Sequence, residues 1–104
     1  MTVKELYQAL KKTGYDVAYR EFKKEPSLPF IAYLEESRDN ICADDGIYLK
    51  FKNMRIELYT AKKDTDAEEK LEKVLEDAGL IYSFTDVGKI ESENLYETVY
   101  NVEI

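Results

Sequence analysis

The residues able to perform acid–base or nucleophilic chemistry in this chain are its carboxylates and one thiol, because the 104-residue sequence contains no histidine. The usual general base near neutral pH is therefore absent, as are the His-containing triads and most zinc sites. Cys42 has Asn40, Asp44 and Asp45 as neighbours, and their polarity and negative charge disfavour the thiolate that a nucleophile requires. We therefore interpret Cys42 as a small, partly buried apolar residue.

The carboxylates and glycines of the chain do not form a recognisable catalytic or ligand motif. Paired acids such as Asp44 and Asp45 suit glycosidic acid and base chemistry when held about 5 to 10 Å apart, but such pairs occur by chance in a chain with 22 acids. Residues 40–46 only partly match a calcium loop, since Cys42 occupies a ligand position and no glutamate stands at the twelfth. The four glycines are scattered, without a P-loop or dinucleotide fingerprint. The sequence predicts no enzymatic activity, no metal and no cofactor.

Charge is divided unevenly along the chain, whose net charge is −7. Residues 64–104 contain twelve acids and three lysines, a sum of −9, whereas residues 1–63 contain ten acids and twelve bases, a sum of +2. Opposite potentials on different surfaces steer copies of a domain toward head-to-tail association. Nucleic-acid binding needs clustered Lys and Arg or a recognition motif, and the chain shows neither. We therefore expect self-assembly and no sequence-specific nucleic-acid partner.

The bulk composition predicts one globular domain, residues 1–104. The length is common for a single domain, and an apolar content of 44% is near the globular average. The single Cys42 excludes an intramolecular disulfide, and residues 1–5 lack the apolar core of a signal peptide. Apolar runs are only a few residues long, so no segment is expected to span a membrane. We expect a reducing, cytoplasmic setting.

Two helices are predicted from capping residues and apolar periodicity. Thr2 with Glu5 forms a capping box that begins a helix of about ten residues, and Thr65 with Glu68 begins a second helix that Gly79 ends. The second helix has an apolar stripe and an acidic outer face. The predicted stripe comprises Ala67, Leu71, Val74, Leu75 and Ala78, and the outer face comprises Glu68, Glu69, Glu72, Glu76 and Asp77.

Alternating apolar residues predict strands at 15–20, 28–35, 54–60, 80–84 and 95–104. Turns are predicted at 43–46, at 52–53 and at 86–89, with a protruding hairpin near 36–48. The order is α-β-β-β-α-β-β. It implies an α+β fold in which two helices pack on one face of a largely antiparallel sheet.

Tyr33 and Tyr59 are expected on the face of the sheet opposite the core, beside Ile31. Their rings require an explanation, because Tyr is enriched both in partly buried cores and at subunit interfaces. Either a helix or loop covers this face, or the face is an interface between subunits.

Several segments together carry a family resemblance: residues 17–22, 28–33, 39–40 with 43–44, 56–64 and 95–104. In these segments the chain resembles small tail proteins of long-tailed phages and prophages of Gram-positive bacteria, of the tail terminator or head-tail joining (tail completion) kind. The resemblance covers nearly the whole chain and rests on segments of structural character, not on catalytic motifs.

The resemblance implies a structural virion protein without catalytic residues. Such a protein forms a ring, typically a hexamer, that caps the finished tail tube and joins it to the head connector. The implied partners are other copies of the chain, the major tail tube protein, and a head connector or head-completion protein. The implied location is the host bacterial cytoplasm during assembly and then the virion tail or neck.

A ring requires a heterologous interface, in which different patches of neighbouring copies meet. We hypothesise that the outer face of helix 65–78 or the final strand supplies acids to basic residues of a neighbouring copy, namely Lys50, Lys52, Arg55, Lys62 or Lys63. The rival hypothesis is an acidic monomeric inhibitor or DNA mimic that acts on a nucleic-acid-binding enzyme and carries its acids as one contiguous band. The candidate interface residues are Tyr33, Asp44, Asp45, Lys50, Lys52, Arg55, Tyr59, Lys62, Lys63, Glu69, Glu72 and Glu76.

Overall fold

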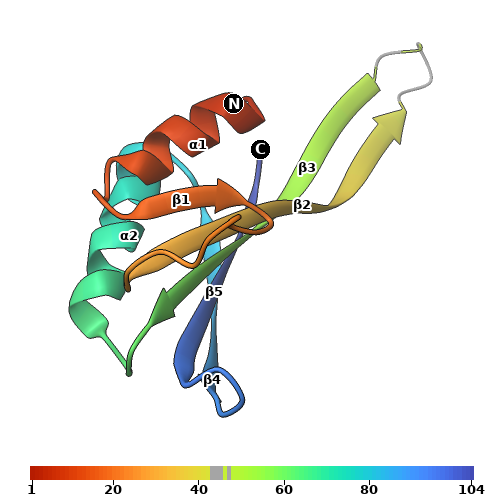
Figure 1. Ribbon diagram of the computed structural model, residues 1–104. Coiled ribbons are helices and arrows are strands. Elements are labelled where there is room, and N and C mark those ends of the chain that lie inside the picture. Colours follow the sequence, from red (N-terminus) through yellow and green to blue (C-terminus); the bar gives the residue numbers. More distant parts are fainter. Residues whose placement is uncertain (43–45, 47) are drawn as a thin grey trace.

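A computed structural model describes residues 1–42, 46 and 48–104 of the chain. It has two helices and a five-stranded sheet of order β1-β2-β3-β5-β4, with both helices on one face (Figure 1). One strand pair, β1 with β2, is parallel, and the others are antiparallel. The predicted α+β class and element order are confirmed. The elements are α1 (Val3–Lys11), β1 (Asp16–Tyr19), β2 (Phe30–Cys42), β3 (Tyr48–Thr60), α2 (Thr65–Asp77), β4 (Tyr82–Ile90) and β5 (Leu95–Glu103).

The caps of the two helices differ in how closely they match the sequence prediction. At α1 the capping box is present, since the Glu5 amide donates to Thr2 Oγ1 and the Thr2 amide donates to Glu5 Oε1. At α2 the predicted capping box on Thr65 is wrong. The N-cap residue is Asp64, one residue before Thr65, and its carboxylate accepts a hydrogen bond from the Ala67 amide. An aspartate at the N-cap also favours the positive end of the helix dipole.

The core lies between the helices and one face of the sheet. Leu71 and Leu75 of α2 and Leu6 and Leu10 of α1 are fully buried against it. We call this side of the sheet the helix face and the other side the outer face. The sheet residues of the core are Val17, Ile31, Tyr33, Met54, Ile56, Leu58, Tyr100 and Val102.

Tyr33 therefore lies on the helix face, and its predicted position opposite the core is wrong. Its side chain is 6% exposed and contacts the Tyr19 ring edge-on, with ring centroids 5.2 Å apart. The alternation of Met54, Ile56 and Leu58 inward with Tyr59 outward is confirmed. Tyr59 is thus the one of the two tyrosines on the outer face.

Two predicted turns lie inside continuous strands. Residues 52–53 are in the middle of β3, where Lys52 is paired with Arg38 and Asn53 with Ser37. Residues 86–89 belong to β4, which continues past an irregularity between Asp86 and Gly88. Gly88 adopts φ +98°, a conformation that favours glycine, so this β-bulge redirects the strand without ending it.

The predicted protruding hairpin is present as an extension of β2 and β3 beyond the body of the protein (Figure 1). We call residues 37–42 and 48–52 the arm. Residues 38–42 pair with residues 48–52, and Ser37 pairs with Asn53. Lys52, at the base, also exchanges two backbone hydrogen bonds of 2.9 Å with Ile104. A bulge between Glu35 and Ser37 marks the point where the hairpin leaves the body. Neither helix among the described residues is long and apolar enough to cross a membrane.

Candidate interaction site

The outer face of the sheet is partly covered by residues 20–29, which link β1 to β2. Arg20 turns the chain with a φ of +67°, and its amide donates to the Tyr33 carbonyl (2.8 Å). The link then places the Phe22 ring edge-on against Phe30, with centroids 5.3 Å apart. Phe30 in turn stacks on Tyr59 at 5.1 Å and an interplanar angle of 26°. Of the two alternatives left open for this face, a loop does cover part of it.

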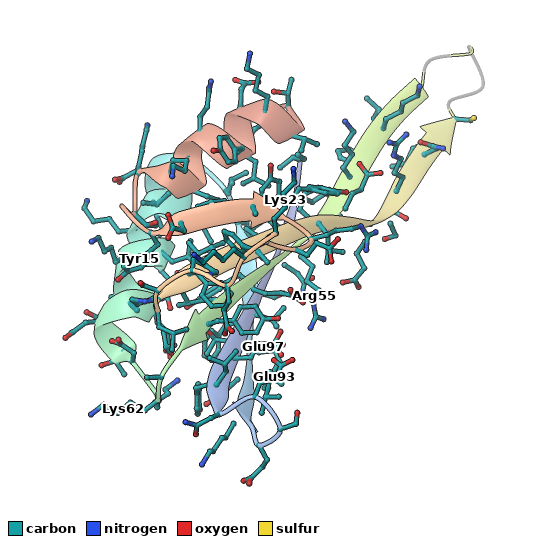
Figure 2. The ribbon with its side chains drawn as sticks, in the orientation of Figure 1. Tyr15, Lys23, Arg55, Lys62, Glu93 and Glu97 are labelled. Atoms are coloured by element: carbon teal, nitrogen blue, oxygen red, sulfur yellow. The ribbon has the colours of Figure 1, made fainter. Side chains whose placement is uncertain are left out.

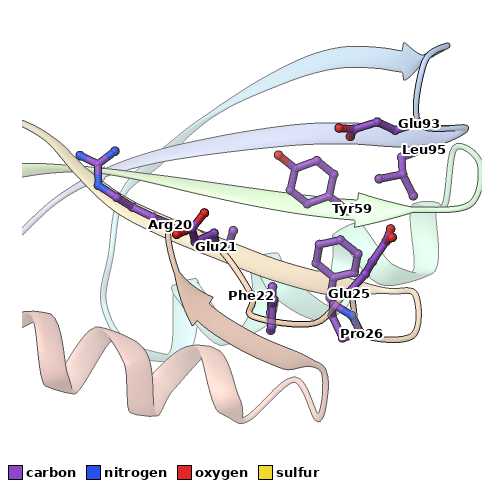
Figure 3. Close-up of a pocket in the computed structure, with 10 residues that line it drawn as sticks. Arg20, Glu21, Phe22, Glu25, Pro26, Tyr59, Glu93 and Leu95 are labelled. Carbon is purple, nitrogen blue, oxygen red and sulfur yellow. The ribbon is translucent and has the colours of Figure 1, made fainter.

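A groove of about 380 Å³ remains beside this loop (Figure 3). Its floor is aromatic, and Tyr59 lies between the loop on one side and Glu93 with Leu95 on the other. The exposed acids of its rim come from two separate parts of the chain, Glu21 and Glu25 from the loop and Glu93 from the turn between β4 and β5. The lining residues are Arg20, Glu21, Phe22, Glu25, Pro26, Phe30, Ala32, Tyr59, Glu93 and Leu95.

A polar network fixes the Tyr59 ring at the floor of the groove. Tyr59 Oη lies 3.2 Å from Glu57 Oε1 and 3.1 Å from Glu97 Oε2, and Arg55 Nε donates to Glu57 Oε2 at 2.9 Å. Burial and the charge of Glu57 raise the pKa of Glu97, which is 7% exposed, while the Tyr59 hydroxyl and Arg55 oppose that rise. Burial and both carboxylates also raise the pKa of Tyr59.

This carboxylate pair is engaged within the protein and does not face a ligand site. Neither Glu57 nor Glu97 lines the groove. Within residues 1–42, 46 and 48–104, no group of three or more Cys, Asp or Glu side chains is placed to hold a metal ion. The network therefore serves to position an aromatic surface, and the groove is a recess that suits a side chain of a partner.

The arm has two chemically different faces. Arg38 is the direct cross-strand partner of Lys52, and Asn40 is the partner of Lys50, so three cations lie along one face. Like charges directly opposite each other on a sheet destabilise it by about 0.2–1 kcal/mol. We call Arg38, Lys50 and Lys52 the cationic face of the arm. Arg38 forms an ion pair with Glu35 of the same strand, so Lys50 and Lys52 are the cations of this face that an anionic partner surface can neutralise.

The opposite face of the arm has exposed apolar side chains beside Asp39. Ile41 and Leu49 are cross-strand partners there, and each is 52% exposed. Cys42, at the end of β2, is on the cationic face with Asn40 and is exposed, so its predicted partial burial is wrong. An exposed apolar pair on a projecting hairpin is unusual for a free monomer and typical of an interaction surface.

The acids of α2 are only partly available to a neighbour. Glu72 accepts from the Tyr100 hydroxyl at 2.6 Å, and Glu76 accepts from the Tyr82 hydroxyl at 2.7 Å. Glu69 is exposed. The structure thus uses two of the three predicted helix acids to bind tyrosines of its own sheet.

Of the two adjacent lysines predicted at the interface, Lys62 and Lys63, Lys63 has partners within the chain. Lys63 Nζ lies 2.9 Å from Glu68 and 3.5 Å from Asp86, and 5.1 Å from the Phe84 ring centroid. Glu68 is 7% exposed, so its predicted position on the outer face of the helix is wrong. Lys62 is exposed just after β3.

The structure brings together some predicted site residues and separates others. Arg55 and Tyr59 belong to one network at the outer face of the body, where Figure 2 labels Arg55. Lys50 and Lys52 lie instead on the arm. Asp44 and Asp45 lie outside the described residues. The prediction missed the groove residues Phe22, Glu25, Phe30, Glu93 and Leu95, for which the only signal was an aromatic residue shortly before Pro26.

Comparison of the chain with models of protein families gives no match, and comparison with curated proteins gives no match either.

Proposed function

We propose that this protein is a structural virion component that forms a ring, a hexamer by the family resemblance, on the end of a phage tail tube. In this role it caps the tube and joins it to the head connector. The observation that carries the proposal is the arm, a two-stranded extension with cations on one face and the exposed apolar pair Ile41 and Leu49 on the other.

An arm of this kind contributes little to the stability of a monomer. Its outer residues do not pack on the helices, and its apolar pair Ile41 and Leu49 remains half exposed. Exposed hairpins are liable to pair with other chains unless they serve a partner. A subunit of a ring has such partners. Other copies of the chain lie beside it in the ring, and the tail tube protein and the head connector lie on the two faces of the ring.

The distribution of acids favours this role over that of a monomeric inhibitor or DNA mimic. A mimic presents free carboxylates in place of phosphates. Among the described residues, eight carboxylates are bound by Tyr, Lys or Arg side chains of the same chain. They are Glu35, Glu57, Glu68, Glu72, Glu76, Asp77, Asp86 and Glu97.

Negative-stain imaging of tails tests the proposal. Tails assembled without this protein are expected to be tubes of uncontrolled length that do not join heads, and the wild-type protein supplied in trans should restore normal virions. The matched variant replaces residues 39–51 by an Asn-Gly turn, which joins the cross-strand partners Arg38 and Lys52 and closes the hairpin near its base. It should fold, by circular dichroism, and fail to restore joining. Normal virions in the absence of the protein would refute the proposed function.

A further inference from the structure

The arm and the groove lie at opposite ends of the same hairpin. Phe30 begins β2 and pairs with Tyr59 near the end of β3, and both rings are at the floor of the groove. The other end of β2 is Cys42, in the arm. Thirteen strand residues at ~3.3 Å each span roughly 40 Å, and the longest dimension of the molecule is 52 Å. The arm therefore cannot reach the groove of its own chain, and any contact between them joins two copies.

The two surfaces are complementary in charge. The arm presents Lys50 and Lys52, neither of which forms an ion pair with another described residue. The rim of the groove presents the exposed acids Glu21, Glu25 and Glu93 against one exposed cation, Arg20, and is therefore negative on balance. Complementary potentials of this kind select a partner and fix its orientation.

The groove also suits the shape of a lysine or arginine side chain. Its aromatic floor of Phe22, Phe30 and Tyr59 can pack against a methylene stem, while the charged end reaches the carboxylates of the rim. Figure 3 shows that Glu25 and Glu93 are on different sides of Tyr59. A cation that lies over Tyr59 is thus between two acids.

We propose that the arm of one copy docks in the groove of the next copy, with Lys50 between Glu25 and Glu93. The inference rests on the proposed function and names the surfaces through which its copies associate. Each copy has one arm and one groove at opposite ends, so the contact is heterologous and repeats from copy to copy.

Crosslinking through the native cysteine tests this contact. Cys42 is the only cysteine of the chain, is exposed, and is two residues along the strand from Asn40, the partner of Lys50. The variant Glu93→Cys places a second thiol on the rim of the groove. With a short bismaleimide, it should give a ladder of dimers and larger multimers at a concentration on the order of 1 mM, where even a contact with a millimolar Kd is half occupied. The control Glu69→Cys, on the exposed side of α2, should give no more product than the wild type.

A charge exchange in the Glu93→Cys background tests the pairing itself. Lys50→Glu should lower the yield of the ladder about tenfold, the effect of losing one close charge pair. Adding Glu25→Lys should restore most of the yield, because the opposite charges face each other again. Lys62→Glu makes the same change of charge at an exposed lysine outside both surfaces and should leave the yield unchanged. Circular dichroism of each variant verifies that it is folded.

Several results would overturn the docking inference: equal crosslinking from Glu69→Cys, crosslinks between two Cys42 residues only, no restoration by Glu25→Lys, or no ladder at all. Sedimentation of the wild-type protein separates these failures from failure of the proposed function. If oligomers form and Cys42 does not reach residue 93, self-association stands and the docking inference is wrong. If neither oligomers nor crosslinks form, the docking inference is wrong and the imaging of tails alone decides the proposed function.

Discussion

The Tyr59 hydroxyl is expected to stabilise the fold in a pH-dependent way. Tyr59→Phe keeps the ring stacked on Phe30 and removes only the donor shared by Glu57 and Glu97. A hydrogen bond to a charged group contributes about 1.5–3 kcal/mol. Because the Tyr59 side chain is only partly buried, solvent screening reduces this contribution, and we expect a loss of ~1–2 kcal/mol in the free energy of unfolding at pH 7.

The sign of the pH dependence follows from Glu97. Its pKa in the folded protein is raised above the ordinary value of 4.5. The folded state therefore binds more protons than the unfolded state between the two values, and stability falls as pH rises through that window. Tyr59→Phe removes a contact that lowers this pKa, so the fall becomes steeper. The cost of the substitution should be largest at pH 7 and should shrink by pH 4, where Glu97 is mostly protonated in both states.

Urea denaturation followed by circular dichroism at pH 7 and pH 4 measures both effects. The matched control is Tyr96→Phe, which removes a hydroxyl that donates to Asp86, a carboxylate 41% exposed to solvent. Its cost should be clearly smaller than that of Tyr59→Phe at pH 7. An equal cost for the two substitutions, or a greater cost of Tyr59→Phe at pH 4 than at pH 7, would refute the reasoning.

Three further substitutions test the fold by the same denaturation assay. Asp64→Ala should lower the free energy of unfolding by about 1 kcal/mol through loss of the N-cap of α2, whereas Thr65→Ala should lower it much less. A larger loss for Thr65→Ala would show that Thr65 is the N-cap, as the sequence predicted. Leu71→Ala removes a fully buried side chain and should lower the free energy of unfolding by about 2–5 kcal/mol. A smaller loss would mean that neighbouring side chains move to fill the space between helix and sheet. Gly88→Ala places a residue with a Cβ at φ +98° and should lower the free energy of unfolding by about 1–2 kcal/mol. The loss comes from the backbone conformation alone, because nothing lies within 4 Å of the added atom. No loss would show that the backbone of the bulge changes its conformation.

Periodicity predicted the parts of the fold in which one face is polar and the other buried. The alternation of Met54, Ile56 and Leu58 with Arg55 and Tyr59 gave the correct faces of β3, since one register alone buries the apolar set. At the start of β2 the same rule failed. Phe30 and Ile31 are both buried, one under the loop and one under the helices, so alternation could not identify the face that contacts the helices.

Local turn signals failed where strands are solvated or bulged. Residues 52–53 are polar because the base of the arm is partly exposed to solvent, and a polar strand resembles a turn in sequence. At α2, Asp64 and Thr65 can both cap a helix, and sequence alone does not decide between adjacent candidates.

The groove could not be predicted from local patterns, because its walls are distant in sequence. Glu25 belongs to the link after β1 and Glu93 to the turn before β5. They share a rim because β3 pairs with β2 on one side and with β5 on the other. That strand order is a property of the whole sheet, so only the structure could reveal it.

In the proposed ring, the geometry of assembly is set inside each subunit. The arm and the groove are joined by two continuous strands whose half nearer the groove is held by the core residues Ile31, Ile56 and Leu58. The direction of the arm relative to the body depends on the bulge between Glu35 and Ser37 and on the backbone pairing of Lys52 with Ile104. A heterologous contact closes into a ring only when the rotation from one copy to the next divides a full turn, and it otherwise extends as a filament. Residues at the base of the arm therefore help to decide between a ring and a filament, although they need not contact a neighbouring copy. They act together with the residues that touch the next copy.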